Sequence, residues 1–118
     1  MKSKFSERDI CTKYITPAIT KAGWDVNPHC CREEVYFTDG RIQVRGQLVS
    51  RKKGKRADYI LYYKPNFPLA IIEAKDNTYP VGAGMQQALE YSEILDIQFI
   101  YSSNGDGFIE HDRTQGFG

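Results

Sequence analysis

The residues best suited to chemistry are two acids and a lysine: Asp58, Glu73 and Lys75. Glu73 and Lys75 end the stretch Leu-Ala-Ile-Ile-Glu-Ala-Lys, residues 69–75, whose first four residues are apolar. Such an apolar run is typical of a buried strand, and side chains two positions apart on a strand share a face. The spacing therefore predicts a carboxylate and an ammonium group side by side at the end of a core strand, where unpaired charge is costly.

Asp58 opens a second strand-like segment, Asp-Tyr-Ile-Leu-Tyr-Tyr, and it converges on Glu73 if the two segments pair. Two carboxylates suit Mg²⁺, which binds one or two of them and keeps several waters. A lysine beside the metal can orient or deprotonate a water and can stabilise charge on a phosphate. These groups predict metal-assisted hydrolysis of a phosphodiester. The alternative is a surface salt bridge at a strand end, which would contribute little.

Three more polar residues could join this site. Gln87 and Tyr91 are four positions apart in a predicted helix, so they share a face and could position a phosphate or a water. An ordinary polar helix face is the alternative. Glu7 lies in the first turn of a predicted helix, where the helix dipole alone accounts for an acid. It could also add a carboxylate to the metal site if that helix packs beside the sheet.

The charge is unevenly distributed, although the net charge is only +1. Residues 41–57 hold seven basic and no acidic residues, whereas residues 58–118 hold three basic and nine acidic ones. A solvated hairpin tip would explain the basic residues. Contact with a polyanion such as DNA is the other explanation, because Lys and Arg bind phosphates. The candidate DNA-binding residues of this basic loop are Arg51, Lys52, Lys53, Lys55 and Arg56.

Length and composition limit the other possibilities. The 118 residues suit one domain, residues 1–118, and no apolar run is long enough to cross a membrane. The N-terminus lacks the apolar segment of a secretory signal, so we expect a cytoplasmic protein with reduced cysteines. No cysteine pair has zinc-site spacing. No phosphate-binding Gly-Lys-Ser/Thr loop is present, so ATP binding by that route is excluded.

The hydrophobic pattern predicts a mixed sheet flanked by helices. A first helix should begin near Glu7, be kinked or interrupted at Pro17 and end at Gly23. Residues 25–33 should be irregular, and an antiparallel meander should follow. A helix–strand–strand ending implies a parallel crossover. The predicted strands are 35–38, 41–50, 57–63, 67–75 (or 69–75), 98–101 and 108–111, and the second helix is 83–95.

The sequence resembles the N-terminal nuclease domain of the type I restriction enzyme R subunit over nearly its whole length. The combination is more specific than any single match. The matching stretches are Ser6-Glu7, Tyr14-Ile15-Thr16-Pro17, Gly23-Trp24, Tyr36-Phe37-Thr38-Asp39-Gly40-Arg41-Ile42, Arg56-Ala57-Asp58-Tyr59, Pro68 to Lys75, Gln87-Ala88-Leu89-Glu90-Tyr91 and Ser103-Asn104-Gly105.

This resemblance implies the PD-(D/E)xK nuclease fold, which is restriction-endonuclease-like, with a mixed central sheet. It implies that Asp58 and Glu73 are metal ligands and that Lys75 is the catalytic lysine. Gln87 and Tyr91 match the family's Q-x-x-x-Y element near the active site and DNA. Glu7 matches a first-helix acid that some members of the wider superfamily use at the metal. Ala57 stands where the motif's name has proline, a position that does no chemistry.

The resemblance also implies an activity and partners. Members of the family cleave unmodified double-stranded DNA with Mg²⁺, for which Mn²⁺ can substitute, in a complex with methylation and specificity subunits. ATP would act only through a motor domain absent from this chain, which we therefore expect to be a fragment of a longer subunit. Two alternatives stay open: a non-catalytic DNA-binding or docking module with the same fold, and an enzyme acting on a small phosphorylated metabolite. The basic loop argues against the second.

Overall fold

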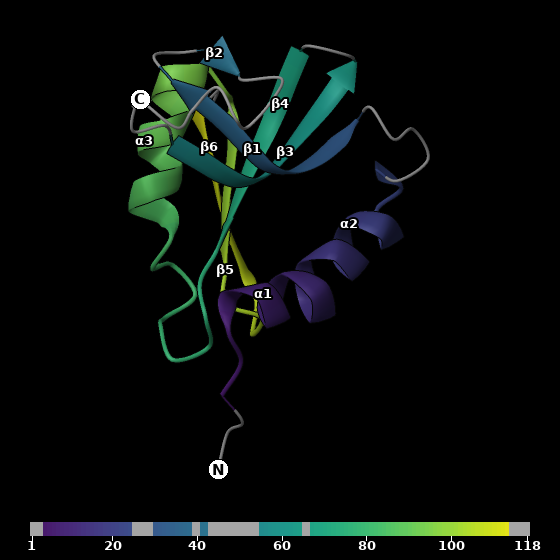
Figure 1. The fold of residues 1–118 in the computed structure, drawn as a ribbon, viewed down its shortest axis with the longest axis vertical. Helices are drawn as coiled ribbons and strands as arrows, with labels where there is room; N and C mark the ends of the chain where they lie inside the picture. The colour runs from purple at the N-terminus through teal and green to yellow at the C-terminus, as the bar shows by residue number, and fades with distance from the viewer. Residues whose placement is uncertain (1–3, 25–29, 39–40, 43–54, 65–66, 114–118) are drawn as a thin grey trace.

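The computed structural model describes residues 4–24, 30–38, 41–42, 55–64 and 67–113 (Figure 1). None of the described helices is long and apolar enough to cross a membrane. The helical elements are α1 (Glu7–Ile10), the π-helix η1 (Cys11–Ile15), α2 (Thr16–Lys21) and α3 (Met85–Leu95). The strands are β1 (Cys31–Thr38), β2 (Arg41–Ile42), β3 (Lys55–Lys64), β4 (Phe67–Ala74), β5 (Phe99–Ser103) and β6 (Phe108–Asp112).

The strands form one mixed sheet in the order β2-β1-β3-β4-β5-β6. Among the described strands, only β4 and β5 pair in parallel, and α3 connects them. The predicted parallel crossover and mixed sheet are therefore confirmed. A parallel pair needs a long connection, which a helix of this length provides.

The predicted meander was wrong in its strand order. A meander would place β2 between β1 and β3, but β1 pairs with both of them and β2 lies at the edge. The predicted irregular segment 25–33 was also wrong at its end, because β1 begins at Cys31 and pairs there with Leu61. The reason is tertiary: the ladder with β3 imposes strand geometry on residues of weak β propensity. Most of the predicted second strand, residues 43–50, lies outside the described residues.

Helices cover both faces of the sheet (Figure 1). On one face, α3 buries the side chains of Ala88, Tyr91 and Leu95 against residues of β3, β4 and β5, including Ile71 and Ile100. On the other face, α1, η1 and α2 pack against a second cluster from the same strands. The central strands β3 and β4 are thus buried on both faces, which agrees with their nearly continuous apolar sequences.

The interruption predicted at Pro17 takes the form of η1. The Thr16 N–H donates to the carbonyl of Cys11, five residues earlier, and α2 then begins with Pro17 in its first turn. The Tyr59 hydroxyl from β3 donates to the same carbonyl at 3.2 Å and lies 2.6 Å from Thr16 Oγ1. Helix α2 ends at Lys21 with Ala22 as its C-cap, and Gly23, the predicted stop, follows directly with a φ of +94° that favours glycine.

Replacing Tyr59 with Phe should lower the free energy of unfolding by about 1–2 kcal/mol, because the Cys11 carbonyl of η1 loses the hydrogen bond from the Tyr59 hydroxyl. Tyr63→Phe on the same strand is the matched control, since its side chain is 57% exposed. We expect the control to change stability by less than about 0.5 kcal/mol. Urea unfolding measures both. Equal losses in the two variants would contradict a structural role for the Tyr59 hydroxyl.

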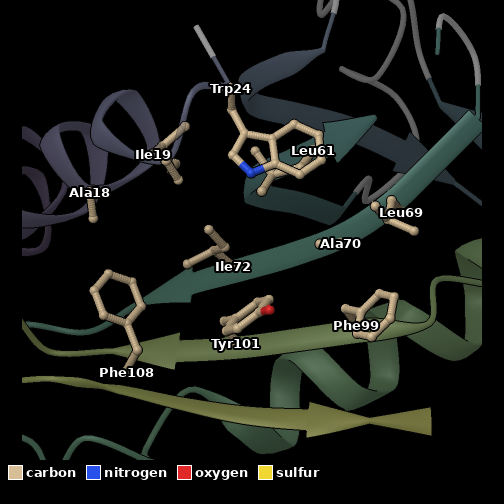
Figure 2. A pocket seen from close by; sticks show the side chains of 11 residues that line it. Ala18, Ile19, Trp24, Leu61, Leu69, Ala70, Ile72, Phe99, Tyr101 and Phe108 are labelled. Atoms are coloured by element: carbon tan, nitrogen blue, oxygen red, sulfur yellow. The ribbon is translucent and has the colours of Figure 1, made fainter. Parts of the chain in front are cut away.

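An apolar cavity of about 390 Å³ lies between α2 and the sheet (Figure 2). Ile19 and Trp24 lie on the helical side, while Ile72 of β4 and Tyr101 of β5 lie on the sheet side. Trp24 is half-buried and packs against this core. The cavity is on the sheet face opposite α3 and apart from the polar site described next.

Candidate active site

Asp58 and Glu73 meet where β3 and β4 end their regular pairing. Backbone pairing of the two strands ends at Tyr59 and Ile72. Beyond that point the side chains replace the ladder: the Asp58 N–H donates to Glu73 Oε2 at 2.7 Å, and the Ala74 N–H donates to Asp58 Oδ2 at 2.8 Å. The convergence expected from the sequence is therefore present in the structure.

Both carboxyl groups are largely withdrawn from water. Glu73 is 2% exposed, and the Asp58 side chain is 11% exposed. Burial raises the pKa of Glu73 to about 8, and the neighbouring Asp58 carboxylate adds to the rise. Burial likewise raises the pKa of Asp58. Two buried acids whose charged forms are disfavoured form a site that a cation would stabilise.

Helix α3 supplies the wall of the site. Gln87 Nε2 donates to Glu73 Oε1 at 2.9 Å and to the Tyr91 hydroxyl at 3.0 Å. Tyr91 is buried and packs edge-on against Phe37, with ring centroids 5.0 Å apart. The shared face of Gln87 and Tyr91 thus lies at the carboxylates rather than on a solvated surface. Gln87 fixes the orientation of Glu73, and Tyr91 fixes Gln87.

Lys75 follows the last residue of β4 and is half-buried. Its backbone N–H donates to the carbonyl of Ser103 at 2.9 Å, which anchors this end of β4 on β5. Its ammonium group lies 5.7 Å from the ring centroid of Tyr79. The Lys75 charge opposes the upward pKa shifts of Asp58 and Glu7, so it acts on the same group of acids.

Glu7 lies at the edge of the site, in the first turn of α1. It lines a small cavity of about 120 Å³ together with Asp58. Burial raises the pKa of Glu7, and the Asp58 carboxylate adds to the rise. Among the described residues, no three His, Cys, Asp or Glu side chains gather as a metal-binding group. Asp58 and Glu73 are two neighbouring carboxylates that could hold a metal, and a ligand role for Glu7 stays a prediction.

Two residues at the site went unrecognised in the sequence. Glu34 of β1 has a φ of +50°, and its Oε1 lies 3.3 Å from the guanidinium of Arg56. Gly84, just before α3, donates its N–H to Ser102 Oγ, and a Cβ there would lie 3.3 Å from Glu73 Cβ. A glycine next to a helix start was visible as a loop signal, but its closeness to Glu73 required the fold.

The basic loop is only partly described. Residues 51–54 lie outside the described residues, so the predicted DNA contacts of Arg51, Lys52 and Lys53 have no structural account. Lys55 is exposed at the start of β3. Arg56 is half-exposed and forms ion pairs with Glu34 and, at 3.4 Å, with Asp58.

The metal-free chain should become less stable as pH rises from about 4.5 to about 8, because the folded-state pKa of Glu73 lies above its ordinary value of 4.5. Below pH 4.5 Glu73 is protonated in both the folded and the unfolded state, so its contribution to the free energy of unfolding is fully present. That contribution is lost as the pH rises to about 8. We expect a loss on the order of 3 kcal/mol, which Glu73→Gln should largely remove. Thermal unfolding across this range, with Glu93→Gln on the exposed side of α3 as control, measures it. A wild-type pH profile in Glu73→Gln would contradict the assignment.

The domain is thus a mixed sheet that is covered by helices on both faces. It carries two largely buried carboxylates at the point where its central strands β3 and β4 separate. Residues 29–116 match the family described as type I restriction enzyme R protein N terminus. The chain belongs to this family.

Two relatives agree with this assignment. The type I restriction enzyme EcoAI endonuclease subunit of Escherichia coli is 50% identical over 112 residues, which are 95% of this chain and 14% of that subunit. A solved fragment structure, assigned to an HsdR subunit of a type I restriction enzyme from Vibrio vulnificus YJ016, has a TM-score of 0.79 and 44% identity. The match covers 98% of this chain and 22% of the solved one. The chain therefore spans a small part of the length of these relatives.

Proposed function

We propose that the chain is the Mg²⁺-dependent endonuclease domain of a type I restriction system, built on the PD-(D/E)xK plan. In this proposal it acts in the cytoplasm on unmodified double-stranded DNA, within a complex that includes methylation and specificity subunits. The observation that carries the proposal is the reciprocal bonding of Asp58 and Glu73, which brings two buried carboxylates together at a strand end. Membership of the R protein family supports the reaction class.

The donor set fits a magnesium ion, for which Mn²⁺ would substitute. Mg²⁺ is usually held by one or two carboxylates, with waters completing its coordination. Asp58 and Glu73 provide that number, and burial raises the pKa of both, so a nearby cation would favour their charged forms. A bound Mg²⁺ supplies Lewis acidity toward a phosphate oxygen and lowers the pKa of a coordinated water.

The remaining residues act by positioning and by charge. Gln87 holds Glu73 Oε1 in a fixed orientation, so the carboxylate needs little rearrangement before it binds a cation. Lys75 would orient the attacking water or stabilise the negative charge that builds on the phosphate. Tyr91, fixed by its packing on Phe37, keeps the Gln87 amide at the site.

Calorimetric titration of the 118-residue chain with Mn²⁺ tests the proposed site. We expect saturable binding to the wild type and its loss in Glu73→Ala, because one of the two carboxylates is gone. Glu93→Ala is the matched control: it removes an exposed acid from α3 and should bind as the wild type does. Unchanged binding in Glu73→Ala, or none in the wild type, would favour a catalytically silent docking module instead.

A further inference from the structure

Glu34 and Asp58 occupy facing positions on β1 and β3 at which both strands change the face they present. The neighbouring pairs are Glu33 with Tyr59 and Val35 with Ala57, so Glu34 lies opposite Asp58 without itself being paired in the ladder. Ala57 packs in the α3-facing core, whereas Tyr59, two residues on, packs in the opposite core. Regular alternation would put these two side chains on one face.

The backbone of Glu34 accounts for part of this break. Its φ of +50° is a left-handed conformation that a non-glycine residue adopts at a cost. On β1, Cys31 packs with the core beneath α1, η1 and α2, while Val35 and Phe37 pack with the core beneath α3. The change of face therefore falls between these residues, where Glu34 lies. Such strain is kept where the surrounding structure or a function requires it.

Arg56 connects the two facing acids. Its guanidinium lies 3.3 Å from Glu34 Oε1 and 3.4 Å from Asp58 Oδ1. Both distances exceed the roughly 2.7–2.9 Å of tight charge-assisted bonds, so each of these two contacts is weak, and Tyr36 of β1 is a further hydrogen-bond partner of the Arg56 side chain. The side chain is also 45% exposed. The guanidinium can therefore move away from either acid and remain in contact with water.

The surrounding charges single out Arg56. The small cavity at this point is lined by Glu7, Glu34 and Asp58, with Arg8 and Arg56 as its cations. Arg8 forms a 2.8 Å ion pair with Glu33. Among the ion pairs of the described residues, Arg56 is the partner of Asp58. A divalent cation on Asp58 would repel the guanidinium and leave Glu34 as its remaining carboxylate.

We propose that Arg56 is a metal-dependent phosphate contact of the nuclease site and that Glu34 is its positioning residue. Without a cation, Arg56 offsets the charge of Asp58. With a cation on Asp58, Glu34 holds Arg56 beside the site, where its free N–H groups bind a DNA phosphate near the cleaved bond. The inference rests on the proposed function, and it gives a role to the strained Glu34.

Binding of a short DNA duplex to the 118-residue chain, followed by fluorescence anisotropy, tests this pair. Each variant is measured in EDTA and in Ca²⁺, an oxygen-binding divalent cation. The variants are Arg56→Ala, Glu34→Gln and their double mutant. Arg32→Ala is the matched control, because Arg32 is an exposed arginine of β1 that stacks on Tyr62 instead.

In Ca²⁺ we expect Arg56→Ala to weaken binding roughly three- to tenfold and to reduce the salt-dependence slope by about one. Glu34→Gln should weaken it about threefold, although the variant removes a negative charge that repels DNA. In EDTA, Glu34→Gln should bind as the wild type or tighter. The double mutant should match Arg56→Ala, because Glu34 acts through Arg56.

Glu34→Gly separates positioning from a structural role. Glycine accepts the left-handed backbone, so the unfolding temperature should stay the same or rise while Ca²⁺-dependent DNA affinity falls. Tighter DNA binding by Glu34→Gln in Ca²⁺, additive losses in the double mutant, an equal loss in Arg32→Ala, or no DNA binding by the wild type would overturn the inference. The proposed function fails separately, through absent or unchanged Mn²⁺ binding in the Glu73 titration.

Discussion

Under the proposed function, Glu73→Gln introduced into a complete type I R subunit and assembled with its partner subunits should reduce DNA cleavage by roughly a thousandfold or more. The substitution keeps the size of the side chain and, with the amide oxygen toward Gln87, the bond from that residue, while the bond from the Asp58 N–H loses its acceptor. It also removes the charge that would hold a divalent cation. Loss of metal-assisted charge stabilisation on a phosphate corresponds to several kcal/mol of activation free energy. The rate of plasmid cleavage under Mg²⁺ measures the effect.

The loss should be specific to cleavage. Glu93→Gln replaces an exposed acid of α3 and should cleave at the wild-type rate. ATP hydrolysis by the assembled Glu73→Gln complex should be largely retained, because the substitution does not touch a motor domain. Near-normal cleavage by Glu73→Gln would exclude this carboxylate from the reaction, and parallel loss of ATP hydrolysis would indicate misassembly instead.

Phe37→Ala should lower the free energy of unfolding by about 3–5 kcal/mol, the usual cost of emptying a buried aromatic site. Phe37 is fully buried on β1 and packs edge-on against Tyr91, with ring centroids 5.0 Å apart. Its loss leaves a cavity beside the residue that fixes Gln87. We therefore expect weaker Mn²⁺ binding in the fraction that remains folded, in addition to the stability loss measured by urea unfolding.

Phe67→Ala is the control for the core variant. Phe67 begins β4 with 49% of its surface exposed, so the same substitution should cost less than about 1 kcal/mol and leave Mn²⁺ binding unchanged. Comparable destabilisation by the two variants would show that the described packing does not place Phe37 at the centre of the core.

Local chemistry explains which parts of the fold were predictable. The apolar run before Glu73 and the periodic segment before Leu95 gave β4 and α3 directly, because periodicity reports burial. Gly23, the predicted stop, lies directly after the C-cap of α2, since a left-handed backbone favours glycine. The meander prediction failed because pairing partners depend on long-range contacts. Sequence neighbours suggested that β2 would lie beside β3, but β1 occupies that position.

The residue types of the candidate site could be predicted from the sequence, but the hydrogen bonds between them could not. An acid opposite an acid at a strand end follows from antiparallel pairing of the two segments, so Asp58 and Glu73 could be paired in advance. The cross-strand bonds could not, because they arise where backbone pairing stops at Tyr59. Glu34 was hidden for a related reason: its left-handed backbone breaks the alternation from which strand faces are inferred.

We expect Asp58 and Glu73 to hold a divalent cation jointly, and a crystal of the chain grown with Mn²⁺ tests this expectation. Anomalous scattering locates the ion independently of the protein atoms. We expect a peak about 2.0–2.3 Å from a carboxylate oxygen of each residue, with waters completing the coordination. A well-ordered site with no peak between these carboxylates, or a peak bound only elsewhere, would contradict it.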